Sequence, residues 1–371
     1  MDTQDLPPTR EAALARLAAV DATAYARTRN HLEGAVTGLS PYLTHGLLSV
    51  PECLAALGLP TEHKLVYEFG WREFFRHVWV HRGDGILRSL HDGPLPEATY
   101  ARTLPDDIRR GATGVPVVDQ AVRTLYATGR LHNHARMWLA SYVVHGRKVH
   151  WRAGADWLYA HLLDGDLASN HLSWQWVAGT GSHKPYLFDA ANVARFAPRT
   201  WHSEGSAIDR SYEEWDRLAR SPERLPAGNA PGLDEPALAV RPATGTPPAP
   251  LQADEVWLAH PWALGEPPRG VRVVAVVITE AHQDRPWSAA RWHWVMARLS
   301  ALSDTCWVGS AAQVASALSG VARVRTQANP HIDRWLPAGA QVAPEPLHFA
   351  AVSPVCGSFS RWWSRVQRLR V

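Results

Sequence analysis

Apolar residues recur with helical spacing along the first 220 residues of the chain. The segments 10–20, 64–81, 115–129 and 135–149 carry them three or four positions apart, which is the period of one helix face. Alternation of apolar and polar residues, the pattern of a half-buried strand, is nearly absent from this part. We therefore predict a helical domain over residues 1–220.

Proline, glycine and alanine then dominate residues 221–252. Such a composition cannot fill a packed core and is typical of a linker. A domain boundary is predicted here.

The pattern changes again beyond this linker. Short β-branched or aromatic runs lie at 256–262, 271–278 and 304–309, with helical stretches at 288–302 and 311–320. Buried strands that alternate with helices favour a parallel sheet. The predicted fold class is thus mainly α: a helical domain followed by a small α/β (Rossmann-like) domain over 253–371. Neither GxGxxG nor GxxxxGK[ST] follows any of these strands, so the sequence does not support nucleotide binding by this second domain.

Composition narrows the function only slightly. The formal net charge is +3, so binding to a polyanion would need a local basic patch. Eighteen tryptophans against seven phenylalanines indicate stacking or redox chemistry, although many of these side chains will simply pack.

The three cysteines, Cys53, Cys306 and Cys356, are too widely separated for a CxxC metal site or a disulfide framework. No HExxH or similar metal-binding spacing occurs among the histidines. The N-terminus lacks the basic start and apolar stretch of a signal peptide, and no run is long enough to span a membrane. These features predict a soluble cytoplasmic protein without a bound metal.

The segment 164–176 (DGDLASNHLSWQW) is the most informative stretch. On one helix, Asp166, Asn170 and Trp174 recur at i, i+4 and i+8 and would share a face that is polar and then aromatic. A ring with amide-like edges, such as a flavin, suits that face. The alternative is a buried helix that carries one satisfied aspartate and one core tryptophan.

Residues 34–43 (GAVTGLSPYL) combine small residues with a helix start. Ser40 is the expected N-cap and Pro41 the first helical residue, so free N–H groups here suit phosphate oxygens. Tyr25 and Arg29, four residues apart, could flank the same anion or a nucleic-acid backbone. A plain capped turn is the alternative.

Two further helices carry candidate polar groups. Glu68 and Arg72 share a helix face, for which an ion pair is the simplest explanation. Asn133 and Met137 share another, and there they could form a cavity wall with an amide and a thioether. A core methionine is the alternative.

The order of these segments carries more information than any one of them. Tyr25 is followed by 37–49, 68–77, 114–123, 128–137, 151–158 and 164–176. In this order they resemble the flavin-binding helical domain of the photolyase/cryptochrome family, over about residues 20–190.

The resemblance implies FAD held in a U-shape. Its phosphates would lie near Tyr25, Thr37, Gly38, Leu39 and Ser40, with Arg72 nearby. Asp164 would pair with Arg136 beside the isoalloxazine, Asp166 would reach the ring or the ribose, and Asn170 would face the flavin N5. Asparagine rather than aspartate in that place is the form of bacterial photolyases, which work with reduced flavin.

The resemblance also implies a cavity for a flipped-out cyclobutane pyrimidine dimer. Its walls would be Glu68, Trp71, Asn133, Met137 and Trp176. The (6-4) photoproduct is disfavoured, because enzymes for that lesion use a histidine pair where this chain has His132 and Asn133. Trp71, Arg29, Arg130 and His134 would contact single- or double-stranded DNA, the last two standing where a tryptophan and an arginine are common in the family.

Electron transfer within the family commonly runs through three tryptophans. Trp174 and Trp151 match the inner and middle members, whereas the outer position falls at Ile108, which cannot carry a hole. Another aromatic, such as Trp157 or Tyr159, would have to replace it.

The expected function is light-driven splitting of cyclobutane pyrimidine dimers in DNA by an electron from excited reduced FAD. The alternatives are a cryptochrome-like blue-light photoreceptor that signals to a protein partner, and a flavin-binding scaffold whose α/β domain makes the interactions. Because the α/β segment follows the helical domain instead of preceding it, a permuted photolyase-like α/β domain or a replacement is expected. The antenna chromophore is left undefined.

Overall fold

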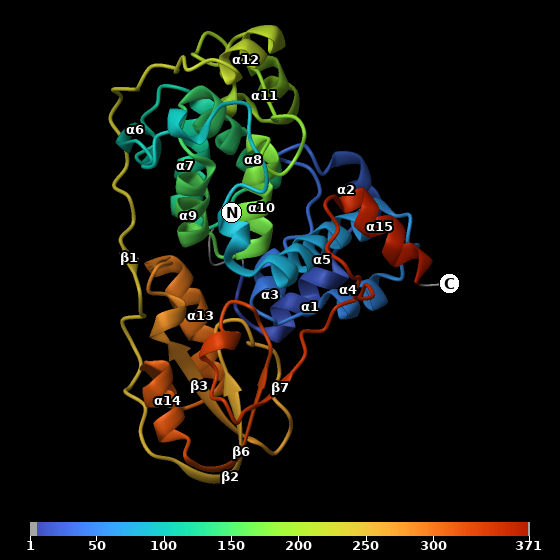
Figure 1. Cartoon of the computed structure of the whole chain (residues 1–371), viewed down its shortest axis with the longest axis vertical. Helices are drawn as coiled ribbons and strands as arrows, with labels where there is room; N and C mark the ends of the chain where they lie inside the picture. The colour runs from blue at the N-terminus through green and yellow to red at the C-terminus, as the bar shows by residue number, and fades with distance from the viewer. Residues whose placement is uncertain (1–5, 370–371) are drawn as a thin grey trace.

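The computed structural model describes residues 6–369. A helical region and an α/β region lie one above the other, and a long irregular segment connects them along one side (Figure 1). Within the described residues, no helix is long and apolar enough to cross a lipid bilayer.

The helical region is built from twelve α-helices before the linker, as far as the described residues extend. They are α1 (Arg10–Ala18), α2 (Ala22–Thr28), α3 (Ser40–Thr44), α4 (Val50–Leu57), α5 (Lys64–Arg82), α6 (Asp106–Arg109), α7 (Pro116–Thr128), α8 (Asn133–Ser141), α9 (Trp151–His161), α10 (Leu167–Ala178), α11 (Ala190–Phe196) and α12 (Tyr212–Ala219). The predicted helical character of this part of the chain is confirmed.

Helix α10 lies at the centre of this region and contacts α5, α8 and α9. Its N-cap is Asp166, whose side chain accepts a hydrogen bond from the Ser169 N–H, and its C-cap is Gly179 with φ of 77°. A left-handed residue at this point ends a helix with little strain only when it is glycine. Both ends of the central helix are therefore fixed by local sequence.

The linker contains one short strand, β1 (Leu238–Ala239), which pairs antiparallel with β4 (Trp287–Ser288). Elsewhere it is held at intervals: the Leu225 N–H donates to Gly146, and the Leu233 N–H donates to Arg110. The linker thus follows the surface of both regions.

The α/β region contains a parallel five-stranded sheet in the order β5-β3-β2-β6-β7. Its strands are β2 (Gln252–Ala259), β3 (Arg272–Ile278), β5 (Cys306–Gly309), β6 (Gly320–Gln327) and β7 (Gln341–Ala343), and its helices are α13 (Ala289–Leu302) and α14 (Ala311–Ala317). Chain order reverses between β2 and β6, as in Rossmann-like sheets. The predicted parallel sheet is confirmed, whereas β6 was not expected because polar residues interrupt it.

The two regions share one hydrophobic core, which joins the sheet to α1, α3, α4 and α5. Polar contacts reinforce this core. Fully buried Arg291 of α13 donates to the carbonyls of Tyr159 and Gly165, and the Trp294 indole donates to the Leu6 carbonyl. The α/β region is therefore fixed against the helices.

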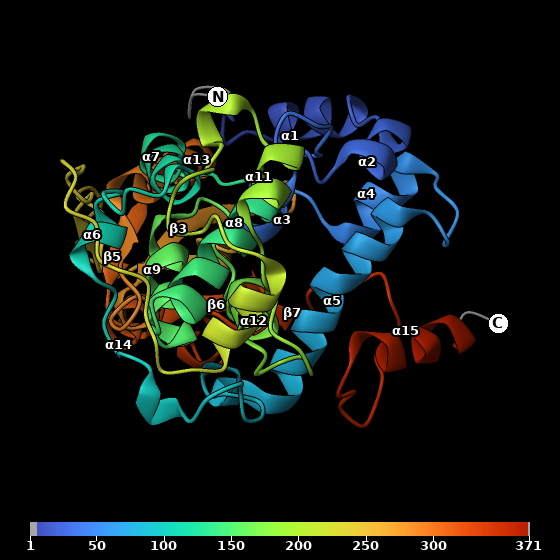
Figure 2. The ribbon, with the colours of Figure 1, turned by 90° about the horizontal axis from the view of Figure 1, so that it is seen from above.

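The chain finally returns to the helical region. Helix α15 (Phe359–Arg368) packs along α5, as Figures 1 and 2 both show. The segment predicted as part of the α/β domain thus ends on a helix of the first region.

Candidate functional site

The residues predicted to surround a flavin come from α2, α3, α5, α8 and α10 and from the segments before α3 and α10. Arg136 of α8 donates from Nη2 to both carboxylate oxygens of Asp164, at 2.9 and 2.8 Å. Burial by itself raises the pKa of Asp164, but Arg136 and the Ser40 hydroxyl outweigh it and hold this pKa below its ordinary value. The predicted ion pair of Arg136 and Asp164 therefore forms, with the carboxylate buried and the guanidinium partly exposed, and its place beside a flavin stays a prediction.

The predicted N-cap role of Ser40 is wrong by one residue. Helix α3 begins at Ser40, its N-cap is Leu39, and no side chain caps it. The Ser40 hydroxyl contacts Asp164 instead, which local sequence could not reveal because the two residues are distant in the chain.

The turn at Thr37 and Gly38 is tight. The Leu39 N–H donates to the Thr37 hydroxyl, and Gly38 has φ of 63°. A Cβ at Gly38 would lie 2.7 Å from a guanidinium nitrogen of Arg16, which comes from α1. The positive φ favours glycine here, and Arg16 covers the turn although the sequence did not single it out.

A hydrogen bond to the Ala155 carbonyl fixes the orientation of the Asn170 amide. Asn170 is 7% exposed, and its Nδ2 donates to the Ala155 carbonyl at 2.8 Å. Its Oδ1 has no partner within the described part of the chain and is left as an acceptor. An acceptor at this position suits an N–H donor on a bound ring.

Asp166 has contacts other than those expected. It caps α10, receives the Arg76 guanidinium at 3.3 Å and lies 3.9 Å from the His331 ring. Burial raises the pKa of Asp166, but Arg76 and Arg72 outweigh it and hold this pKa well below its ordinary value. Asp166 therefore precedes the first turn of α10, whereas Asn170 and Trp174 lie within the helix. The contact of Asp166 with a flavin stays a prediction.

The five side chains predicted to line a substrate cavity share one property. Glu68, Trp71, Asn133, Met137 and Trp176 all keep contact with solvent, Trp176 being 37% exposed. Their helix neighbours Phe69, Gly70, Ala135, Trp138, Trp174 and Val177 are buried. The five residues thus mark the accessible faces of α5, α8 and α10.

The two sides of this surface are joined by the turn after α2. Glu68 lies 3.3 Å from Arg29 and 3.0 Å from Lys64, so the ion pair expected with Arg72 does not form. Arg72 donates to the Thr44 hydroxyl instead, at 3.4 Å. The hydroxyl of Tyr25 contacts Arg29, so the two residues lie together as their spacing indicates, and a shared contact with an anion stays a prediction.

On the α8 side, Asn133 Nδ2 lies 3.7 Å from the Met137 sulfur. His134 is 9% exposed, and its ring nitrogens contact the Asn30 carbonyl and the Tyr186 hydroxyl. Because both nitrogens are in use, the geometry argues against the predicted contact of His134 with DNA. The Tyr186 ring also packs at 5.8 Å from Trp176.

The predicted electron path is incomplete in the described structure. Trp174 and Trp151 are both buried, and the Trp174 ring packs closely on Gly154 of α9. Ile108, at the expected outer position, is fully buried. Trp157 packs against Tyr126 and His161, and Tyr159 lies near His171 and His331, so both candidate replacements are interior residues.

The packing of α15 on α5 could not be predicted from the sequence of residues 64–81. The Phe359 ring of α15 stacks on Trp71 with ring centroids 4.1 Å apart and an interplanar angle of 11°. An amphipathic spacing at 359–366 (Phe359, Trp362, Val366) could have predicted α15 itself, but not the helix on which it packs.

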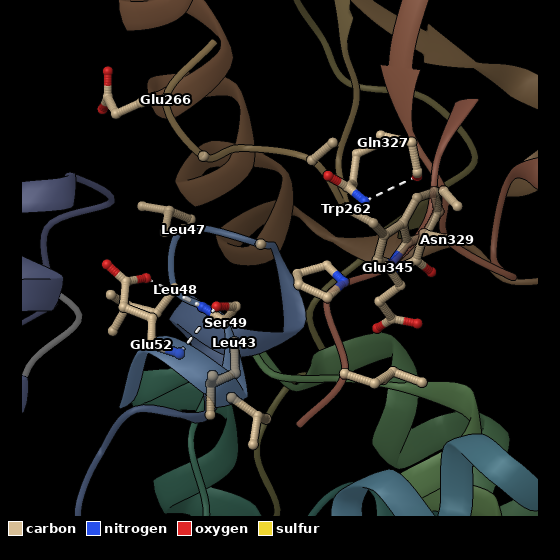
Figure 3. A pocket seen from close by; sticks show the side chains of 18 of the residues that line it. Leu43, Leu47, Leu48, Ser49, Glu52, Trp262, Glu266, Gln327, Asn329 and Glu345 are labelled. Atoms are coloured by element: carbon tan, nitrogen blue, oxygen red, sulfur yellow. Dashed lines mark hydrogen bonds between the residues drawn. The ribbon is translucent and has the colours of Figure 1, made fainter. Parts of the chain in front are cut away.

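A cavity of about 500 Å³ lies where the carboxyl ends of β2, β6 and β7 face α3, α4 and α5. Figure 3 shows Ser49 and Glu52 on one side of it and Gln327, Asn329 and Glu345 on the other. Arg72 lines it, whereas the other described residues predicted to hold the flavin do not. The cavity is therefore distinct from the proposed flavin surroundings.

A family model described as the FAD-binding domain of DNA photolyase matches residues 65–220. Residues 65–220 of this chain thus belong to the photolyase/cryptochrome family. The match spans α5 to α12 and therefore includes most of the residues predicted for the site.

Named relatives of this chain include deoxyribodipyrimidine photo-lyases and cryptochromes. A deoxyribodipyrimidine photo-lyase from Streptomyces griseus is 36% identical over 49% of this chain and 42% of its own length. That from Escherichia coli is 32% identical over 57% of this chain and 46% of its own, and a cryptochrome DASH from Gloeobacter violaceus is 32% identical over 46% and 36%. The chain thus spans less than half the length of these curated relatives.

Solved structures of the family are also similar to this chain. A Synechocystis cryptochrome aligns with 25% identity and a TM-score of 0.47, covering 59% of this chain and 53% of that one. An archaeal photolyase from Sulfolobus tokodaii aligns with 24% identity and a TM-score of 0.46, covering 61% and 53%.

Proposed function

We propose that this protein binds FAD in its helical region and uses light to split cyclobutane pyrimidine dimers in DNA. The observation that carries the proposal is the shared exposure of Glu68, Trp71, Asn133, Met137 and Trp176 on helices whose other faces are buried. Aromatic rings, an amide and a carboxylate on accessible helix faces suit a pair of extruded bases.

The residues present fit FAD. Asn170 keeps an amide oxygen without a partner among residues 6–369, and Gly38 takes a left-handed conformation that favours glycine, with the Arg16 guanidinium beside it. Arg136, Asp164 and Asn170 would hold the ring, and Thr37 to Ser40 would lie along the phosphates. When bound, reduced FAD supplies an electron on illumination.

The chain's own residues then have defined tasks. The Glu68 carboxylate, positioned by Arg29 and Lys64, accepts hydrogen bonds from the bases. Trp71 and Trp176 stack on them, each stack contributing about 1–3 kcal/mol. Asn133 and Met137 form the wall on α8 and exclude water.

A second function, blue-light signalling to a protein partner, is favoured by one observation. Cryptochromes occur among the relatives at similar identity to the photo-lyases.

Repair under light separates these functions. Reduced, FAD-loaded protein is illuminated with an oligonucleotide that contains one thymine dimer, and restored thymines are counted per absorbed photon. We expect Glu68→Ala to keep FAD and to lower the repair yield about tenfold, the effect of one lost charged hydrogen bond. Glu62→Ala, which removes an exposed carboxylate just before α5, is the matched control and keeps the wild-type yield.

A wild-type protein that binds FAD and restores no thymines would overturn the repair proposal and favour signalling. An unchanged yield for Glu68→Ala would remove the role of Glu68 in holding the bases.

A further inference from the structure

Helix α15 is anchored on α5 through its whole apolar face. Phe359, Trp362 and Val366 are buried, and Phe359 stacks on Trp71. A Cβ at Gly70 would lie 2.4 Å from the Trp363 ring, so glycine at this position permits the close packing of the two helices. The apolar side of α15 is therefore fully used inside the protein.

The segment that leads to α15 is held by two side chains of α5. Glu73 accepts hydrogen bonds from the N–H groups of His348 and Phe349, at 2.7 and 2.9 Å. His77 Nε2 accepts one from the Cys356 N–H at 2.9 Å. These contacts fix the position of α15 beside Trp71.

The outer side of α15 is strongly basic. Between residues 346 and 369 the chain carries Arg361, Arg365 and Arg368 and no carboxylate, although the formal net charge of the whole chain is only +3. Arg361 and Arg368 are exposed, and Arg365 is directed toward the Pro354 carbonyl. Within the described residues, none of the three forms an ion pair with a carboxylate.

Excess positive charge without internal partners is typical of a surface that binds a polyanion. A lipid surface is disfavoured, because an interfacial helix must offer its apolar face, and that face is buried against α5. The stack of Phe359 on Trp71 places the first turn of α15, which carries Arg361, beside a residue of the substrate surface, and Arg368 lies about two turns further along the helix.

We propose that α15 is a second DNA-binding element, whose Arg361 and Arg368 contact backbone phosphates next to the extruded bases. This inference rests on the proposed function, since it assumes that DNA lies across Trp71. Phe359 serves as a positioning residue that fixes the plane of the Trp71 indole. The contacts read no sequence, so they strengthen binding to damaged and undamaged DNA alike.

The test compares the double variant Arg361→Glu/Arg368→Glu with the wild type by fluorescence anisotropy on labelled duplexes with and without a thymine dimer. We expect at least tenfold weaker binding to both duplexes and an unchanged preference for the dimer. The slope of log affinity against log salt becomes shallower by about 1.8, or about 0.9 for each lost phosphate contact. The flavin absorbance and the far-UV circular dichroism stay as in the wild type.

Two matched variants control for net charge and for folding. Arg269→Glu/Arg272→Glu changes the total charge equally at two exposed positions near the start of β3, and we expect wild-type affinity. Arg361→Lys/Arg368→Lys keeps the charge on α15 and retains most of the affinity, since phosphate is bound largely through charge.

Wild-type affinity and salt slope in Arg361→Glu/Arg368→Glu would overturn this inference and leave the repair proposal in place. Equal weakening by Arg269→Glu/Arg272→Glu would also overturn it, by showing an effect of total charge. A wild-type protein that binds dimer DNA without repairing it, but loses affinity in the α15 variant, would overturn repair and support the inference. No binding of DNA by the wild type would overturn both.

Discussion

The helical region and the α/β region differ in how specific their side chains are. In the helical region, individual polar groups occupy positions that a particular chemistry needs, such as Asn170 with its unpartnered oxygen and the pair of Arg136 and Asp164. In the α/β region, a run of buried apolar residues is enough for β3 to pair within the sheet. The family match accordingly covers α5 to α12 and none of the sheet. A region whose function depends on particular side chains keeps a recognisable sequence. A region that only needs buried apolar residues can be built from many different sequences.

The largest expected effect is on the ion pair of the site. Arg136→Ala leaves the buried Asp164 carboxylate with the Ser40 hydroxyl but without its ion-pair partner, which we expect to lower the free energy of unfolding by about 3 kcal/mol. Bound flavin should be lost as well. Denaturant unfolding and the flavin absorbance measure the two effects.

The matched change in the α/β region is Arg323→Ala, which breaks an exposed pair with Glu255 between β6 and β2. We expect a loss below about 1 kcal/mol there. Equal losses for the two variants would contradict the contrast between the regions.

The next effect depends on pH. Burial raises the pKa of Glu73 to about 7, against the lowering by its bonds from the His348 and Phe349 N–H groups. A carboxyl whose pKa is raised on folding contributes stability that is complete below its unfolded value and is lost as pH rises through 7. The full loss is about 3 kcal/mol.

Glu73→Gln removes this titration and keeps an acceptor oxygen. We expect the wild type to lose about 3 kcal/mol relative to this variant between pH 4.5 and pH 8, as measured by denaturant unfolding at each pH. Parallel pH profiles for the two proteins would show that Glu73 titrates normally.

A smaller effect is expected where the two regions meet. Arg291→Met keeps the apolar stem but leaves the carbonyls of Tyr159 and Gly165 without a donor. We expect a loss of about 2 kcal/mol. Hydrogen exchange of the α9 and α13 amides would reveal faster local opening; unchanged exchange and stability would show that the shared core alone joins the regions.

The smallest effect concerns the stack beneath the substrate surface. Phe359→Leu keeps an apolar side chain but removes the ring contact with Trp71, at an expected cost of about 1 kcal/mol. Binding of dimer DNA should weaken several-fold while the flavin content stays unchanged. Val366→Ala shortens a buried side chain of α15 at a distance from the stack and serves as the control. Equal weakening of DNA binding by both variants would indicate that the packing of the whole helix was lost rather than the ring stack.

Much of the fold followed from local patterns, because helix periodicity and β-branched runs act over a few residues. The ion pair of Arg136 and Asp164 also followed, from the resemblance. By contrast, the engagement of Asp166 with Arg76 and His331, and of Ser40 with Asp164, joins segments far apart in sequence. Strand β6 was not expected because Arg323 and Arg325 break its apolar run. The packing of α15 on Trp71 could be seen only in the structure, because the pattern of an amphipathic helix does not indicate which element it packs against.

The return of the chain to α5 has a consequence for how the molecule holds together. Segments on both sides of 221–252 are interleaved: Trp294 bonds Leu6, Arg291 bonds Tyr159, and α15 lies on α5. Proteolytic nicking of that exposed stretch would therefore yield two polypeptides that remain a single particle. Covalent continuity there is dispensable for the folded assembly, which makes the position suitable for producing the protein as two complementing fragments.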